Sequence, residues 1–162
     1  MFWRLLKTAL FTVVAPGTVA YFLPHWLVLS GHPARAWGLG PWRYLGLVPV
    51  VIGVPVYLWC AWDFAVSGLG TPAPIDAPRK LVAKGLYRFV RNPMYVGVGS
   101  VIAGQVVLFE SRVLLVYLAL LWLYFHLFVV FYEEPTLRRK FGGEYGDYCR
   151  RVPRWLPRLT TK

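Results

Sequence analysis

The chain has 162 residues, of which 57% are hydrophobic, and 18 Lys and Arg residues face 7 acidic ones, for a formal net charge of +11. The length favours one domain, and the hydrophobicity excludes an ordinary soluble domain. The basic residues flank long apolar runs instead of forming one stripe, which argues against a nucleic-acid-binding protein. We therefore expect an integral membrane protein whose charges lie in its loops.

Four apolar segments have about the length that a membrane span requires. A spanning helix needs about 20 apolar residues, with about 17 as the lower limit. The first two segments exceed this length, the fourth matches it, and the third just reaches it. We predict one all-α domain over residues 1–162, a polytopic membrane protein with four transmembrane helices and a cytoplasmic amphipathic C-terminal tail. The predicted spans are residues 5–29, 44–66, 93–109 and 113–132.

The first segment follows Arg4 and Lys7, as a secretory signal peptide also would. Its apolar run is too long for a signal peptide, and no clear small-residue cleavage site follows it, so we interpret it as a membrane helix. Pro16 with Gly17, and Pro55 in the second segment, are expected to kink their helices, which neighbouring helices tolerate.

The distribution of basic residues predicts the orientation in the membrane. Arg35, Arg43 and Arg112 lie in the loops on one side. The other Lys and Arg residues lie near the N-terminus, between the second and third segments, and after the fourth. Cytoplasmic loops are the ones enriched in Lys and Arg. We therefore expect both termini and the Pro- and Gly-rich loop 67–84 in the cytoplasm.

The tail after the fourth segment has a helical pattern. One face holds apolar and aromatic residues at spacings of three and four, and the opposite face is basic. An amphipathic helix resting on anionic lipid accounts for most of these charges. The inner face comprises Leu137, Phe141, Tyr145 and Tyr148, and the outer face Arg138, Arg139 and Lys140.

Cysteine and histidine spacing predicts no metal site. Cys60 and Cys149 are far apart in the sequence, and His25, His32 and His126 are scattered singly. Neither set has the spacing of a metal centre or of a disulfide framework. His126 lies in the fourth segment, where a lone histidine is more often an interhelical hydrogen-bonding group than a catalytic base.

The third segment begins with a polar and aromatic cluster. Asn92 followed by Pro93 is typical of a helix start, in which Asn92 caps the first turn. That interpretation leaves Tyr87, Arg91 and Tyr95 at the same boundary unexplained. Because helix N-termini bind carboxylates and phosphates, an anionic ligand group is a second interpretation of this cluster.

Small residues follow along the third segment. Those four apart are most often a close helix–helix contact, and we assign Ala103 and Gly104 to such a contact. Gly97 and Gly99 lie nearer the helix start, where they also allow a ligand to approach the backbone. A dinucleotide-binding fingerprint requires a preceding strand and a third glycine, and neither is present here.

A pair of acidic residues, Glu133 and Glu134, ends the fourth segment. Because adjacent helical positions point in different directions, we expect one carboxylate to face a pocket and the other to pair with Arg138 at i+4. Carboxylates at a helix C-terminus oppose the helix dipole. A cationic ligand group or a sugar diol would explain their presence.

These residues resemble the integral-membrane methyltransferases, the isoprenylcysteine carboxyl methyltransferases and the phospholipid N-methyltransferases. The resemblance covers about residues 79–157, half of the chain. Its first part is Gly85-Leu86-Tyr87, Arg91 to Tyr95 and Gly97. Its second part is Glu133-Glu134, Leu137, Phe141-Gly142, Tyr145, Tyr148 and Val152-Pro153.

The resemblance implies that S-adenosyl-L-methionine binds on the cytoplasmic side, in the regions of about residues 79–99 and 133–157. The implied cofactor-binding residues are Leu81, Val82, Tyr87, Asn92, Pro93, Met94, Tyr95, Gly97, Gly99, Glu133 and Glu134. Arg91, His126 and Arg138 are candidate substrate-binding residues, and no catalytic residue is assigned. Methyl transfer from a sulfonium requires mainly alignment and exclusion of water, and no strong general acid.

Two departures from the family pattern bear on the substrate. Asn92 stands where the family usually has histidine. Val129 and Val130 stand where prenylcysteine enzymes carry an arginine shortly before the Glu pair. We therefore favour a lipid amine or another amphiphile that enters from the bilayer. The alternatives are a nicotinamide-dependent membrane reductase of the sterol-reductase type and a small transporter or scaffold.

Overall fold

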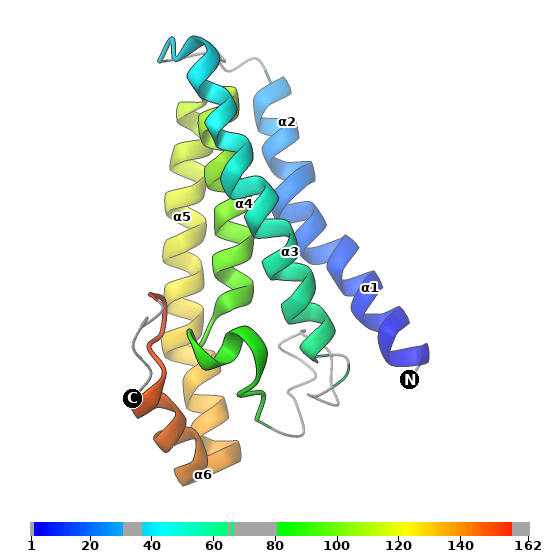
Figure 1. Cartoon of the computed structure of the whole chain (residues 1–162), viewed down its shortest axis with the longest axis vertical. Helices are drawn as coiled ribbons and strands as arrows, with labels where there is room; N and C mark the ends of the chain where they lie inside the picture. Colours follow the sequence, from blue (N-terminus) through cyan, green and yellow to red (C-terminus); the bar gives the residue numbers. More distant parts are fainter. Residues whose placement is uncertain (1, 31–36, 65, 67–80, 157–162) are drawn as a thin grey trace.

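The computed structural model describes residues 2–30, 37–64, 66 and 81–156. Within these ranges the secondary structure is helical and contains no strand (Figure 1). Residues 67–80 of the predicted loop 67–84 lie outside the described residues. The elements are α1 (Phe2–Gly17), η1 (Thr18–Phe22), α2 (Leu23–Leu29), η2 (Gly40–Gly46), α3 (Leu47–Asp63), η4 (Gly85–Arg88), α4 (Pro93–Phe109), α5 (Arg112–Phe128), η5 (Val129–Glu133) and α6 (Glu134–Arg151).

In the described part of the chain, three helices are long and apolar enough to cross a membrane: Thr8–Leu29, Gly40–Asp63 and Arg112–Arg151. The helix α4 is also apolar but has only 17 residues, the lower limit for a span. Large apolar side chains such as Val51, Leu120 and Phe131 are exposed on the outer surface, as expected of helices that face lipid. The prediction of an all-helical polytopic membrane protein is thus confirmed, with three to four spans in the described part.

The first span is one continuous helix with a wide π turn, η1, between α1 and α2. In this turn the N–H of Leu23 reaches back five residues to the carbonyl of Thr18, and Pro24 has no N–H to donate. The carbonyls of Val19 and Ala20 are bound by side chains instead. Tyr117 of α5 donates to Val19 O at 2.8 Å, and Gln105 of α4 donates to Ala20 O at 2.6 Å. Neighbouring helices therefore stabilise this irregular turn.

Helices α3 and α4 pack backbone against backbone through glycines. A Cβ at Gly53 would lie 2.6 Å from the carbonyl oxygen of Gly97. A Cβ at Gly104 would overlap the carbonyl of Gly46 and lie 2.6 Å from Val50 Cγ2. The predicted helix contact at Gly104 is confirmed, and its partner is α3. Such close packing holds the entrance of α4 in a fixed position.

Replacing Gly104 by alanine should destabilise the protein by about 1–3 kcal/mol, the usual cost of overpacking a close contact. The added methyl group can be accommodated only if the backbones of α3 and α4 move apart. Gly143→Ala in α6 is the matched control, because a Cβ there meets nothing within 4 Å. Thermal unfolding in detergent should show a lower Tm for Gly104→Ala only; equal Tm values for both variants would contradict this packing.

The helix of the fourth predicted segment continues past Tyr132. It runs from Arg112 through α5 and η5 into α6, which is kinked at Gly142 and ends at Arg151. The turn η5 widens to a π helix, in which the N–H of Glu134 donates to Val129 O, and Pro135 follows directly. The wide turn accommodates the proline, so the helix continues where the sequence predicted an end. Glu133 and Glu134 therefore lie in the middle of a helix and not at its C-terminus.

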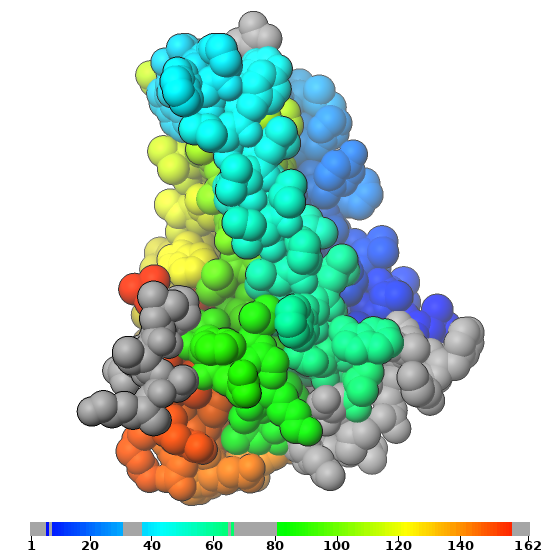
Figure 2. Space-filling view, in the orientation of Figure 1, coloured from blue at the N-terminus to red at the C-terminus, as the bar shows by residue number. Residues whose placement is uncertain are grey.

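The helix α6 has the predicted two faces. Tyr145 and Tyr148 are buried together with Val152, while Arg138 and Lys140 are exposed. Gly142 adopts φ 54° and ψ −125°, which kinks the helix and turns it back toward the bundle. Figures 1 and 2 show α6 and the following residues (orange to red) against the segment before α4 (green).

Candidate active site

The site lies where the start of α4 meets the π turn η5. The Tyr95 hydroxyl, in the first turn of α4, donates a hydrogen bond to Glu133 Oε2 at 3.0 Å. The Tyr95 ring packs against Phe125 of α5, with 4.7 Å between ring centroids. Two predicted site residues that are 38 positions apart in the sequence are thus in direct contact. Among the described residues, the Tyr95 hydroxyl is the hydrogen-bond partner of the Glu133 carboxylate.

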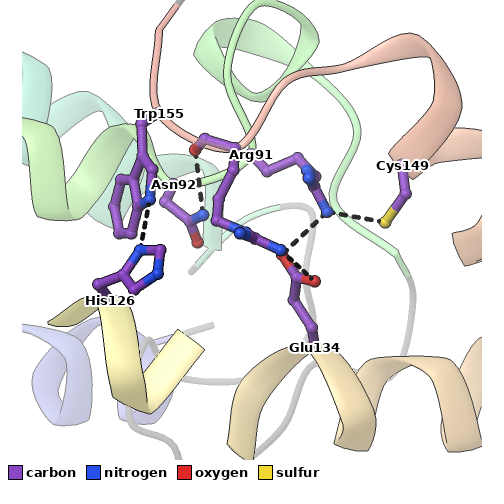
Figure 3. A network of polar contacts seen from close by, with 7 residues as sticks. Arg91, Asn92, His126, Glu134, Cys149 and Trp155 are labelled. Atoms are coloured by element: carbon purple, nitrogen blue, oxygen red, sulfur yellow. Dashed lines mark hydrogen bonds and ion pairs between the residues drawn. The ribbon is translucent and has the colours of Figure 1, made fainter. Parts of the chain in front are cut away.

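Glu134 faces a different set of groups. Arg91 Nη1 lies 2.9 Å from its Oε1 (Figure 3). Arg154 forms two contacts with the same carboxylate, Nε to Oε1 at 2.7 Å and Nη2 to Oε2 at 3.1 Å. The Glu134 side chain is only 8% exposed, and that of Arg91 13%. Hydrogen bonding to Glu134 raises the pKa of Arg154 further above its usual range. The carboxylate of Glu134 is therefore occupied by two cations.

The predicted pairing of Glu134 with Arg138 is wrong. Arg138 is exposed on the outer face of α6, whereas Glu134 points inward toward Arg91 and Arg154. The structure does not bring Arg138 to the site. Arg91 contacts Cys149 as well, with Nη1 3.0 Å from Sγ.

Asn92 precedes α4, but its side chain does not cap the first turn as predicted. Its Nδ2 donates to the carbonyl of Arg154 at 3.1 Å, and the N–H of Arg91 donates to the carbonyl of Pro153 at 2.9 Å. The segment 153–155 thus runs along the entrance of α4. The first-turn N–H groups of α4, Met94 onwards, have no side-chain cap, a favourable place for an anionic group.

Trp155 is brought to the site by the same segment. Its Nε1 donates to Nδ1 of His126 at 3.2 Å (Figure 3), and its ring lies 4.9 Å from Trp122 and 6.4 Å from Tyr95, between centroids. Because an indole N–H only donates, His126 Nδ1 is the acceptor of this hydrogen bond. His126 is thus a hydrogen-bonding residue, as predicted, but its partner lies in the segment after α6 and not in another helix. No sequence pattern indicated that Trp155 would lie at the site.

The segment before α4 packs against the end of α3. Val82 and Tyr87 form a buried cluster with Cys60, and Met94 packs against it. Burial holds the pKa of Tyr87 well above its usual range, so its phenol stays neutral at pH 7. Tyr148 of α6 donates to the carbonyl of Tyr87 at 2.8 Å. The sequence did not predict that α3 contributes to the site.

The remaining predicted residues are placed in three ways. Pro93 is buried at the first position of α4, and Leu81 packs with Tyr145 and Tyr148. Gly97 lies against Gly53 of α3, and a Cβ at Gly99 would lie 3.0 Å from Trp122 of α5. The two glycines therefore face helices α3 and α5 and not Glu133.

Two buried polar atoms in this region have no hydrogen-bond partner among the described residues: Asp63 Oδ2 and Arg91 Nε. Buried polar atoms are nearly always paired, so an acceptor and a donor of this kind fit a polar ligand. These two atoms lie in the same region as Glu133, the tyrosine hydroxyls and the uncapped first turn of α4. Together these groups suit a ligand that carries an ammonium, a carboxylate and hydroxyl groups. S-adenosylmethionine has this composition.

Comparison with known proteins gives consistent results. The sequence profile of the family described as "Phospholipid methyltransferase" matches residues 42–144. The chain is 33% identical over 135 residues to the nickel-cobalt-cadmium resistance protein NccN of Alcaligenes xylosoxydans xylosoxydans, covering 82% of this chain and 59% of that protein. It is 32% identical over 121 residues to a probable protein-S-isoprenylcysteine O-methyltransferase of Oryza sativa subsp. indica, covering 70% and 60%.

A further relative is protein-S-isoprenylcysteine O-methyltransferase B of Arabidopsis thaliana, 35% identical over 80 residues, 48% of this chain and 40% of that protein. The chain thus spans about 60% of the length of the first of these relatives. No solved structure matches it. The profile match covers well over half of the chain and contains α3, α4, α5 and both acidic residues of the pair. The chain belongs to the phospholipid methyltransferase family of membrane methyltransferases.

Proposed function

We propose that this protein transfers a methyl group from S-adenosylmethionine to a lipophilic acceptor that enters from the bilayer. The observation that carries the proposal is the hydrogen bond between Tyr95 and Glu133. It joins the two sequence motifs of the family resemblance at one place, beside the uncapped start of α4. Family membership supports methyl transfer as the reaction class.

The groups that would hold the cofactor come from three elements. Glu133 would bind the ammonium group or the ribose hydroxyls, and the first turn of α4 would receive the carboxylate. Tyr87 and Tyr95 would lie near the sulfonium, where aromatic faces stabilise a cation. The chemistry that the bound cofactor supplies is an activated methyl group on a sulfonium sulfur.

The protein's own contribution would be alignment and exclusion of water. His126 Nδ1 is engaged by the indole N–H of Trp155, so we assign this nitrogen no role as a base. Phe125 and Trp155 pack against the Tyr95 ring, and Trp122 packs against Trp155. This aromatic carbon would limit the access of water to the reacting groups. Glu134 would act as a positioning residue, because it holds Arg91 and Arg154.

A lipid amine is the acceptor that we favour. Val129 is buried where prenylcysteine enzymes carry an arginine. Arg91 and Arg154, the arginines beside the acidic pair, are both bound to Glu134 and thus engaged. Neither of these two arginines is therefore available to bind the carboxylate of a methyl acceptor.

We also propose that the site faces the cytoplasm, with both termini on that side. The start of α1 and the whole of α6 lie at the same end of the bundle as the site (Figure 1). The basic residues Arg88, Arg91, Arg138 and Lys140 are at this end, as the positive-inside rule requires for the cytoplasmic side.

The test is transfer of a radiolabelled methyl group to total membrane lipids by the purified protein in lipid nanodiscs. We expect label in the organic phase, most of it in amine-containing phospholipids. Leu120→Ala, on the exposed face of α5, is the control variant that should retain activity. Absence of transfer, combined with thermal stabilisation by NADPH and not by S-adenosylhomocysteine, would favour the reductase; a response to neither would favour a transporter or scaffold.

A further inference from the structure

Asp63, the last residue of α3, has a buried carboxylate oxygen that lacks a partner. Its Oδ2 accepts no hydrogen bond from any described residue. A buried acceptor that is left unpaired destabilises the protein, and more so when the group is charged. A membrane protein that keeps such a group at a helix end gains from a partner that binds there.

The other acidic side chains of the described part that are buried or lie near the site have partners. Glu110 Oε2 accepts from the N–H of Leu39 at 3.0 Å, at the opposite end of α4. Glu133 accepts from Tyr95, and Glu134 is bound by two arginines. Asp63 is the exception among these carboxylates.

The unpaired oxygen faces the segment that leads into α4. A Cβ at Gly85 would collide with Asp63 Oδ2, and it would also lie 3.2 Å from Trp59 Nε1. Gly85 has φ 54°, a backbone conformation that favours glycine. Because Gly85 has no side chain, the Asp63 carboxylate can lie against the backbone at the start of η4.

This position adjoins the candidate site. Cys60, one turn before Asp63, is fully buried against Val82 and Tyr87, with Met94 packed on the same cluster. The end of α3 and the segment 81–88 thus contribute to the same buried cluster. A ligand that contacts Tyr87 and Met94 would lie within the same cluster as the end of α3.

We propose that Asp63 Oδ2 binds a donor group of S-adenosylmethionine, its ammonium or a ribose hydroxyl. The inference rests on the proposed function and adds a second carboxylate to the site, from an element outside the family motifs. Both candidate donors are N–H or O–H groups, and either satisfies the unpaired oxygen. Glu133 would take the other donor group of the cofactor.

The experiment measures the Kd of S-adenosylhomocysteine for the purified protein in detergent. Asp63→Asn should weaken binding about tenfold or more, since a charge-assisted hydrogen bond is replaced by a neutral one. Asp147→Asn, an exposed aspartate of α6, is the matched control and should bind as the wild type does. Comparison with 5′-methylthioadenosine, which lacks the ammonium, separates the two donors. If Asp63 binds the ribose, both ligands weaken; if it binds the ammonium, only S-adenosylhomocysteine does.

A second measurement avoids any folding defect of the variant. In the wild-type protein, bound S-adenosylhomocysteine should protect Asp63 from labelling by a hydrophobic carbodiimide, as read by peptide mass spectrometry. Unchanged Kd in Asp63→Asn, or equal labelling of Asp63 with and without the ligand, would overturn the inference while leaving the proposed function intact. If the wild-type protein binds no S-adenosylhomocysteine at all, the proposed function itself fails.

Discussion

Replacing Glu133 by alanine should abolish S-adenosylhomocysteine binding while the fold is retained. The carboxylate has one partner in the described part, the neutral hydroxyl of Tyr95, so its removal strands no buried charge. It does remove the acceptor that we assign to the cofactor ammonium or ribose. We expect Kd to rise at least about 100-fold, the effect of losing a charge-assisted interaction in a desolvated site. Isothermal titration in detergent measures it.

Glu144→Ala is the control for this prediction. Glu144 is an exposed carboxylate on α6, and its removal changes the net charge by the same amount. Its Kd should equal that of the wild type. If the Kd of Glu133→Ala for S-adenosylhomocysteine is within threefold of the wild-type value, Glu133 does not bind the cofactor.

Replacing the adjacent Glu134 by alanine should act on stability instead. The substitution leaves Arg91 and Arg154 close together without their shared anion. Removing one partner of a buried ion pair typically costs about 3–5 kcal/mol, and we expect the lower part of this range because Arg154 is 31% exposed. Thermal unfolding in detergent should show a large fall in Tm, with partial recovery in Glu134→Gln.

The contrast between the two neighbours makes this prediction specific. The Glu133→Ala protein should unfold at the wild-type Tm but no longer bind S-adenosylhomocysteine. The Glu134→Ala protein should unfold at a lower Tm. If Glu134→Ala unfolds at the wild-type temperature but no longer binds S-adenosylhomocysteine, then Glu134 contacts the cofactor, and the ion pairs seen here are rearranged in the bound state.

The helices could be predicted well because the length of the apolar runs and the residues at their ends determine them. The range of α4 agrees at both ends, since Pro93 fixes its first turn and Glu110, with φ 50°, follows its last residue. The continuation of the helix beyond Tyr132 was not predicted, for a related reason. Pro135 resembles a helix terminator, but the π turn before it accommodates the missing N–H.

The candidate site could be predicted only in part because its contacts are long-range. The contact between Tyr95 and Glu133 follows from two motifs that lie at the same end of adjacent helices. The partners of Asn92 and Glu134 come from the segment 153–155, which local spacing rules do not place. Asp63 at the end of α3 belongs to no motif, and only its buried, unpartnered Oδ2 beside Gly85 identifies it.

The most direct test is an experimental structure of the purified protein with S-adenosylhomocysteine. We predict that the nucleotide lies between the first turn of α4 and the turn η5, with a polar group within hydrogen-bond distance of the Glu133 carboxylate. A ligand seated away from both Tyr95 and Glu133, for example on the far side of α5, would contradict the assignment.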